Sequence, residues 1–115
     1  MSIQRISPGP RFCGAVVHDS TVYVAGQTAS DTSAGVRGQT EQVLKKIDEL
    51  LAAAGTDKSK LLSATVYLSD IRGFDEMNAA WVAWVDKNNL PTRATVEAKL
   101  AAAGLLVEIV VTAAR

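Results

Sequence analysis

The hydrophobic positions of the chain repeat with two different periods, and together they predict an α+β protein. Between residues 39 and 54, apolar residues recur at spacings of three and four, which is typical of an amphipathic helix. Residues 74–88 repeat this pattern and predict a second helix, which Pro91 ends. Apolar residues elsewhere tend to alternate with polar ones or form short runs, which indicates strands. The predicted strands are residues 4–6, 14–18, 22–25, 61–68, 90–100 and 105–114.

Turn residues and element order indicate how these segments are connected. Asp19 and Ser20 separate two strands and predict a hairpin, although the glycine that best suits such a turn is missing. Gly55 stands where a left-handed helix C-cap is expected. A chain of 115 residues suits one compact domain, residues 1–115. We therefore expect a single α+β domain in which a mixed six-stranded sheet has both helices on one face.

A sheet that is covered by helices on one side has a second, bare face. Strict alternation along the strands places Leu61, Tyr67, Leu106 and Val110 on that face, among small polar residues. Such a surface is too apolar to face water in a monomer, so we expect the chain to associate with copies of itself through this face.

Composition and charge exclude several classes of protein. The chain is 48% hydrophobic and 21% charged, close to the globular average. Its twelve basic and twelve acidic residues cancel, whereas nucleic-acid binders usually carry a basic excess. No leader and no apolar stretch long enough to span a bilayer are visible, so we expect a cytoplasmic protein with no membrane contact. His18 and Cys13 occur once each and cannot form a metal site, so no metal is expected.

The same single residues are poor candidates for nucleophilic chemistry. His18 has no partner in the sequence and is expected at the surface, while Cys13 is expected to be a small buried residue. Trp81 and Trp84 are three positions apart on a predicted helix and are expected in the core or an interface.

Two largely apolar strands near the C-terminus each carry a lone charge of opposite sign. Arg93 offers a planar fork of donors that matches a carboxylate and stays charged at any relevant pH. Glu108 could act as a general base toward water. The alternatives are a buried structural ion pair or an exposed cross-strand pair, the latter worth about 0.2–1 kcal/mol.

The stretch PTRATVEA, followed later by VEI, resembles the signature of the RidA/YjgF family of reactive intermediate deaminases. The similarity also covers VYVAGQ, the end of the first helix, ATVYL, and the start of the second helix. It extends in the family's order over nearly the whole chain. The signature residues that match are Pro91, Thr92, Arg93, Val107, Glu108 and Ile109.

The resemblance implies a chorismate-mutase-like α+β fold and a homotrimer with clefts between subunits. In such a cleft Arg93 would hold the carboxylate of a 2-imino acid. Glu108 would position and activate a water that attacks the imine carbon, giving a 2-keto acid and ammonia without a cofactor. The backbone of Thr95 would help to hold the ligand, and Gly26 and Asn78 would line or support the cleft.

The chain departs from the family pattern in its N-terminal loop. Many members have Gly-Pro-Tyr there, whereas this chain has Gly-Pro-Arg11-Phe12, similar to the branch typified by YoaB. Arg11 and Phe12 are therefore expected to contact the substrate, with Arg11 either adding a second cation for a dicarboxylate or narrowing the pocket. Thr95 stands where many members have cysteine, a change that a backbone role would survive.

Two further functions compete with deamination. The same cleft could belong to a binding module for keto acids or dicarboxylates, with little turnover, for which Arg93 and Arg11 would suffice. RNA binding or ribonuclease activity is a label attached to relatives. The balanced charge and the lack of a histidine pair argue against it.

Overall fold

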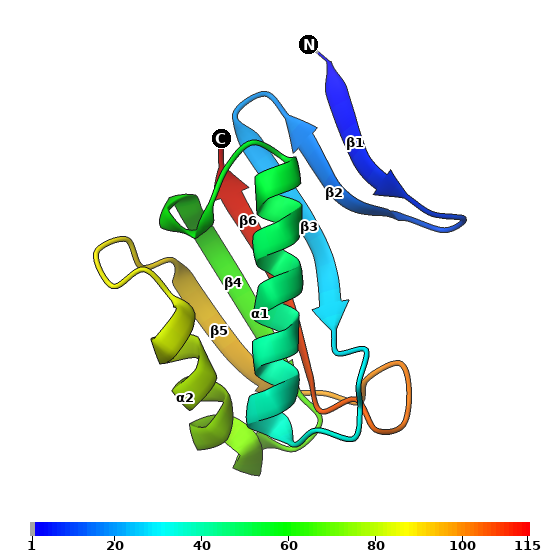
Figure 1. The fold of residues 1–115 in the computed structure, drawn as a ribbon, viewed down its shortest axis with the longest axis vertical. Helices are drawn as coiled ribbons and strands as arrows, with labels where there is room; N and C mark the ends of the chain where they lie inside the picture. Colours follow the sequence, from blue (N-terminus) through cyan, green and yellow to red (C-terminus); the bar gives the residue numbers. More distant parts are fainter. Residues whose placement is uncertain (1) are drawn as a thin grey trace.

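The computed structural model describes residues 2–115, which form one six-stranded sheet with two helices on one face (Figure 1). The strands are β1 (Ile3–Pro8), β2 (Cys13–His18), β3 (Thr21–Thr28), β4 (Leu61–Leu68), β5 (Thr92–Glu97) and β6 (Val107–Ala114). The helices are α1 (Val36–Ala53) and α2 (Phe74–Trp84), with short 3₁₀ turns η1 (Lys58–Lys60) and η2 (Ile71–Gly73). The strand order is β1-β2-β3-β6-β4-β5, and only β4 and β5 run parallel. The predicted mixed sheet is confirmed.

The apolar stripe of α1 forms the centre of the core. Val43, Ile47 and Leu51 are fully buried, and the inward-facing residues of β3, β4 and β6 are buried with them. Burying each such side chain contributes about 1.5–3 kcal/mol before chain entropy is counted. The helix begins at Val36, one turn earlier than the periodicity indicated, and no side chain caps its first turn.

The C-terminal end of α1 follows the prediction closely. Gly55 has φ +80°, the left-handed conformation that glycine adopts without a steric penalty. The amide of Gly55 donates to Ala52 and the amide of Thr56 donates to Leu51, each at 3.0 Å. This is the Schellman pattern, which satisfies carbonyl groups that the helix leaves unpaired.

Helix α2 is shorter than predicted. It ends at Trp84 rather than at residue 88. The carboxylate of Asp86 accepts hydrogen bonds from the Asn88 amide and from the side chain of Asn89. Such local side-chain bonds compete with helical hydrogen bonding and favour a turn, so the helix stops before them.

The prediction of which residues lie on the open face was wrong at one position of β4. Leu61 is 6% exposed and belongs to the core, whereas Leu62 is 48% exposed. The pairing of β4 with β6 shifts register between Leu61 and Ser63, so strict alternation fails at that point. Tyr67 and Val110 do lie on the open face, and both are half-buried.

The N-terminal hairpin carries the two residues that were expected to be chemically inert. Asp19 supplies the left-handed turn residue, with φ +55°, where glycine was missing. The side chain of His18 is 43% exposed, as expected for a surface histidine. Cys13 is half-buried rather than buried, because it begins β2 opposite Pro8, next to the tip of the β1–β2 hairpin.

Gln39, fully buried at the start of α1, ties the loop before β6 to the helix. Its side-chain nitrogen donates to the carbonyls of Ala34 and Gly104, and its oxygen accepts from the amide of Leu106. The chain is therefore held in place two residues before Glu108.

In residues 2–115, neither helix combines the length and the apolar composition needed to cross a bilayer.

Candidate functional site

Arg93 lies on the helix-covered face of the sheet, at its edge. Its register partner on β4 is Ala64, a buried core residue, so both side chains point toward the helices. The guanidinium carbon lies 5.3 Å from the ring centre of Trp81 and 5.9 Å from that of Phe74. Both distances are within cation–π range. The Nη1 atom lies 3.9 Å from the sulfur of Met77, a weak acceptor.

The guanidinium of Arg93 has no carboxylate partner in the described chain. The ion pairs of residues 2–115 involve other side chains, and the only acceptor near Arg93 is a thioether. Partial burial lowers the pKa of Arg93, but an arginine remains charged at any relevant pH. Its planar donor fork is therefore free to bind a carboxylate.

The backbone beside Arg93 is also free. Within residues 2–115, strand β5 pairs only with β4 and forms one edge of the sheet. The amide of Ala98 donates to the carbonyl of Leu68 at 2.9 Å, toward β4. Because backbone groups alternate in direction along a strand, the amide and carbonyl of Thr95 point to the free edge. This geometry suits the backbone role that the family resemblance implied for Thr95.

Glu108 lies on the opposite face. It stands between Val107 and Ile109, both fully buried, so its own side chain points to the open side. The register of β3 with β6 shifts between Val24 and Gln27, which brings Gly26 against Glu108. A methyl group at position 26 would overlap the Oε2 atom of Glu108. Gly26 therefore supports the carboxylate by leaving space for it.

A single chain does not bring Arg93 and Glu108 together. They lie on opposite faces of the sheet, and β4 separates β5 from β6. No ion pair joins them within residues 2–115, so the cross-strand pair considered above does not form. The cavity lined by Glu108 does not include Arg93, so within residues 2–115 the two groups share no pocket.

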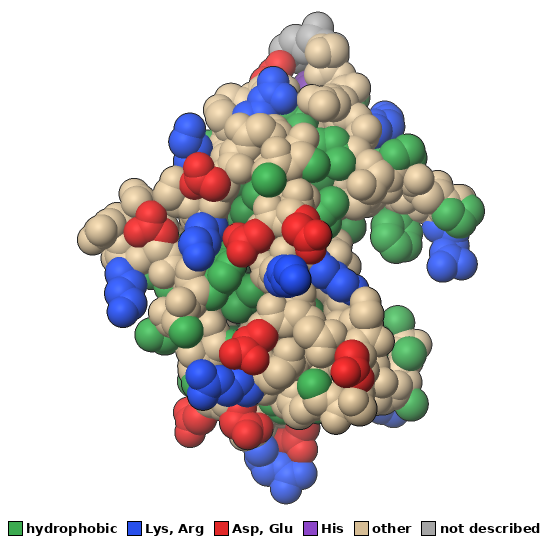
Figure 2. Space-filling view, viewed as in Figure 1, with side chains coloured by type: hydrophobic (Ala, Val, Ile, Leu, Met, Phe, Trp, Pro, Cys, Tyr) green, Lys and Arg blue, Asp and Glu red, His purple; other side chains and the backbone are tan. Residues whose placement is uncertain are grey.

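Arg11 and Phe12 lie in a third place, at the tip of the β1–β2 hairpin. The amide of Gly9 donates to the carbonyl of Phe12 and closes the tip, where the Phe12 ring is 66% exposed. Figure 2 shows this arm projecting to the right, with the surface hollowed beneath it. The pocket there measures about 410 Å³ and is lined by Ser7, Gly9, Pro10, Arg11, Phe12, Gly14, Gln27, Lys46, Glu49 and Leu50. Neither Arg93 nor Glu108 lines it.

The α2 surface around Arg93 also holds Asn78. Asn78 is half-buried and lies one helical turn after Phe74, on the side of α2 that faces Arg93. Phe74, Met77 and Trp81 were not predicted to belong to the site, although their spacing along one helix face could have indicated a shared surface. Trp81 is buried, as expected, and its ring has the additional contact with Arg93.

Across residues 2–115, no cluster of three or more His, Cys, Asp or Glu side chains is arranged to hold a metal ion.

Known proteins resemble this chain over most or nearly all of its length. The family model described as Endoribonuclease L-PSP matches residues 2–115. A RutC family protein from Haemophilus ducreyi is 47% identical over 112 residues, which cover 97% of this chain and 96% of that protein. The Escherichia coli RutC family protein YoaB is 39% identical over 114 residues, 99% of each chain. A human protein named 2-iminobutanoate/2-iminopropanoate deaminase is 35% identical over 107 residues, 88% of this chain and 77% of the human one.

Solved structures agree with these relatives. The crystal structure of a YjgF family member from Neisseria meningitidis matches with a TM-score of 0.97 at 37% identity, covering 100% of this chain and 96% of the other. A family member from Mycobacterium tuberculosis matches with a TM-score of 0.89 at 29% identity, covering 99% of this chain and 100% of the other. Sequence and fold therefore agree with the resemblance carried by the two charged strands, and the chain belongs to the RidA/YjgF family.

Proposed function

We propose that this protein hydrolyses reactive 2-imino and enamine acids, of the 2-aminoacrylate type, to 2-keto acids and ammonia without a cofactor. The observation that carries the proposal is the guanidinium of Arg93, which is partly buried against two aromatic rings and lacks a carboxylate partner in residues 2–115. Relatives named as deaminases of 2-imino acids support the same chemistry.

Arg93 binds the substrate carboxylate in two parallel hydrogen bonds. The rings of Trp81 and Phe74 limit where the guanidinium can move, so the fork is oriented before the substrate arrives. The free edge of β5 at Thr95 adds backbone groups, and Asn78 lies on the neighbouring helix. These contacts fix the imine carbon at a set distance from the edge of the sheet.

Glu108 supplies the base. It accepts a proton from a water whose oxygen attacks the imine carbon, and the C=N electron pair moves to nitrogen, which takes up a proton. The resulting carbinolamine forms its C=O bond as the C–N bond breaks; its hydroxyl proton passes to the departing nitrogen, which leaves as ammonia. No oxidation state changes, so the reaction balances with water as the only co-reactant. An enamine substrate enters as its imine tautomer.

The site is completed between copies of the chain. Arg93 and Glu108 occupy opposite faces of one sheet, so each cleft takes Arg93 from one copy and Glu108 from another. A homotrimer that associates through the open face accounts for the apolar residues there, including Tyr23 and Val96. The tip of the β1–β2 hairpin, which carries Arg11 and Phe12, extends beyond the body of the sheet (Figure 1). We expect it to reach a neighbouring copy. We assign the reaction to the cytoplasm and expect no nucleic-acid partner.

A coupled assay tests the proposal. A pyridoxal-phosphate dehydratase generates the imino acid in situ, and the release of the 2-keto acid is followed with and without this protein. Wild type is expected to accelerate release, and Arg93→Ala is expected not to. Arg37→Ala, which removes an exposed arginine paired with Glu41 on α1, is the matched control. If wild type is no faster than Arg93→Ala, the enzyme proposal fails.

The binding-module alternative uses the same free guanidinium. Calorimetry with keto acids distinguishes the two functions, because a module binds the ligand without accelerating release of the product. An absence of binding to any small carboxylate removes the module as well.

A further inference from the structure

The open face of the sheet contains a cavity with a cation that the proposed reaction does not use. The cavity measures about 310 Å³, which is within the range of small-molecule sites, about 300–1,000 Å³. It is lined by Tyr67, Ala98, Lys99, Leu100, Glu108 and Val110. It therefore joins the proposed base to the start of the loop between β5 and β6.

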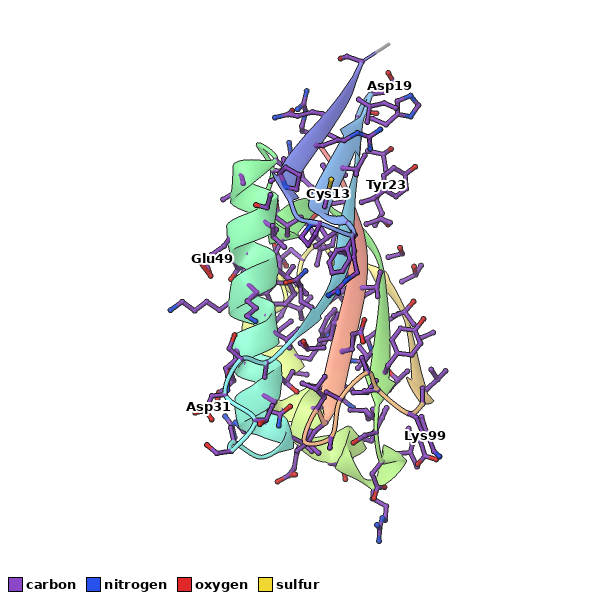
Figure 3. All side chains as sticks on the ribbon, turned by 90° about the vertical axis from the view of Figure 1, so that its right-hand side faces the viewer. Cys13, Asp19, Tyr23, Asp31, Glu49 and Lys99 are labelled. Atoms are coloured by element: carbon purple, nitrogen blue, oxygen red, sulfur yellow. The ribbon has the colours of Figure 1, made fainter. Side chains whose placement is uncertain are left out.

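Strand register explains how these residues meet. Tyr67 and Glu108 are partners on adjacent antiparallel strands, so their side chains are neighbours on the same face. Lys99 follows Ala98, whose amide is bonded to the carbonyl of Leu68, so the backbone is fixed just before the lysine. Figure 3 shows Lys99 on the side of the sheet away from α1, as is Tyr23.

The two charged groups of the cavity are not paired. Within residues 2–115, neither Lys99 nor Glu108 takes part in an ion pair, either with each other or with another side chain. They therefore line one cavity with more than ion-pair distance between them. A ligand group that is negatively charged would be repelled by Glu108 and attracted by Lys99, so it would bind at the lysine end.

We propose that Lys99 is a specificity-determining residue that selects substrates with a second anionic group, such as imino and keto dicarboxylates. This inference rests on the proposed function and deepens it by naming the substrate class. Arg93 of one copy binds the carboxylate next to the imine, and Lys99 of the copy that supplies Glu108 binds the distal one. A monocarboxylate leaves the ammonium of Lys99 in water and gains nothing from it.

The structure favours Lys99 over Arg11 as the second cation. Arg11 lines the pocket beneath the hairpin, together with Lys46 and Glu49 of α1, on the helix-covered side of the sheet. Lys99 lines the cavity that contains Glu108. Substitutions at the two positions therefore have different expected effects.

Equilibrium binding measurements distinguish the role of Lys99 from that of Arg11. Calorimetry measures the Kd of 2-oxoglutarate, a dicarboxylate, and of 2-oxobutanoate, a monocarboxylate, for each variant. Lys99→Gln is expected to weaken 2-oxoglutarate binding about tenfold, equivalent to about 1.4 kcal/mol, and to leave 2-oxobutanoate unchanged. Lys99→Arg is expected to retain the discrimination, because it keeps the charge. Lys45→Gln, on the exposed side of α1, is the matched control and should resemble wild type.

Several outcomes would overturn the inference. These are an unchanged 2-oxoglutarate Kd in Lys99→Gln, an equal loss for both ligands, a loss of discrimination in Arg11→Gln instead, or no binding of either ligand to wild type. Size-exclusion chromatography of each variant identifies losses that come from altered assembly. A wild-type protein that discriminates through Lys99 but does not accelerate imine hydrolysis would contradict the proposed function alone.

Discussion

The two faces of the sheet carry different halves of the proposed chemistry. On the helix-covered face, Arg93 lies against Trp81 and Phe74, and the guanidinium is partly withdrawn from water. On the open face, Glu108 lies beside Gly26 and a cavity that other side chains only partly enclose. The two helices pack on one face, whereas no element within residues 2–115 covers the other.

This difference separates stability from the proposed chemistry: the helix-covered face stabilises the fold, whereas the open face carries an acid without an arginine beside it. The helix-covered face supplies the apolar burial that stabilises the domain. The open face supplies an acid and apolar side chains that water does not favour. Association of copies would bury this surface and bring the acid to a neighbour's arginine at the same time. The following predictions test whether the two faces work together in this way.

The largest expected effect comes from removing the two charged groups in two different variants. Arg93→Ala and Glu108→Gln should each reduce kcat/KM about 100- to 1,000-fold, because each removes a group that acts in the transition state. If each site takes Arg93 from one copy and Glu108 from another, refolding the two variants together in equal amounts should restore about one quarter of the sites. Each of the two copies has a chance of about one half of being the variant that supplies an intact residue. The coupled keto-acid assay measures the recovery.

The control for this experiment is each variant refolded alone, which should remain inactive. If both residues acted within one chain, the mixture would recover no activity, since every chain would lack one of them. That result would refute the proposal that the site is formed between subunits.

The next expected effect is on the free energy of unfolding, and it differs between adjacent positions of β6 that face opposite sides of the sheet. Ile109 is fully buried under the helices, so Ile109→Ala should lower the free energy of unfolding by about 2–5 kcal/mol. Val110 points to the open face, so Val110→Ala should cost about 1 kcal/mol, with a larger loss on dilution if copies cover that face. Denaturant unfolding at two protein concentrations measures both. A loss for Val110→Ala that is independent of concentration would contradict an interface there.

Much of this arrangement could be predicted from the sequence. Arg93, Thr95 and Glu97 share one side of β5, as the two-residue period of side chains along a strand predicts. The helix end at Gly55 was predicted because only glycine adopts the left-handed cap without strain. Both features depend on local rules that act over a few residues.

Features that depend on distant pairing could not be predicted. Strand β6 inserts between β3 and β4, and the registers of β5 and β6 with β4 put Arg93 and Glu108 on different faces. The register shift that buries Leu61 is likewise a property of the β4–β6 pair and not of β4 alone. Lys99 follows a strand in a loop without periodicity, so only the folded chain shows that it shares a cavity with Glu108.

A smaller effect is expected at the bulge that makes room for Glu108. Gly26→Ala introduces a methyl group that overlaps the Glu108 carboxylate, which must then turn aside. We expect kcat to fall about tenfold, because the base is displaced from its position. Unfolding should change little, since the side chain that moves is flexible and lies on the open face. Ala25→Gly, one position earlier in β3, is a matched control for the bulge. An unchanged kcat for Gly26→Ala would show that the carboxylate position is not critical.

The smallest expected effect concerns the aromatic contact on the other face. Phe74→Leu keeps the apolar volume near Arg93 but removes the ring whose centre lies 5.9 Å from the guanidinium. An exposed cation–π contact is worth about 0.5–1 kcal/mol, so KM should rise about two- to fivefold with kcat unchanged. Phe74→Tyr keeps the ring and should resemble wild type in initial-rate measurements. A fall in kcat with constant KM would mean that Phe74 acts on the transition state, and the orienting role given to the ring would be wrong.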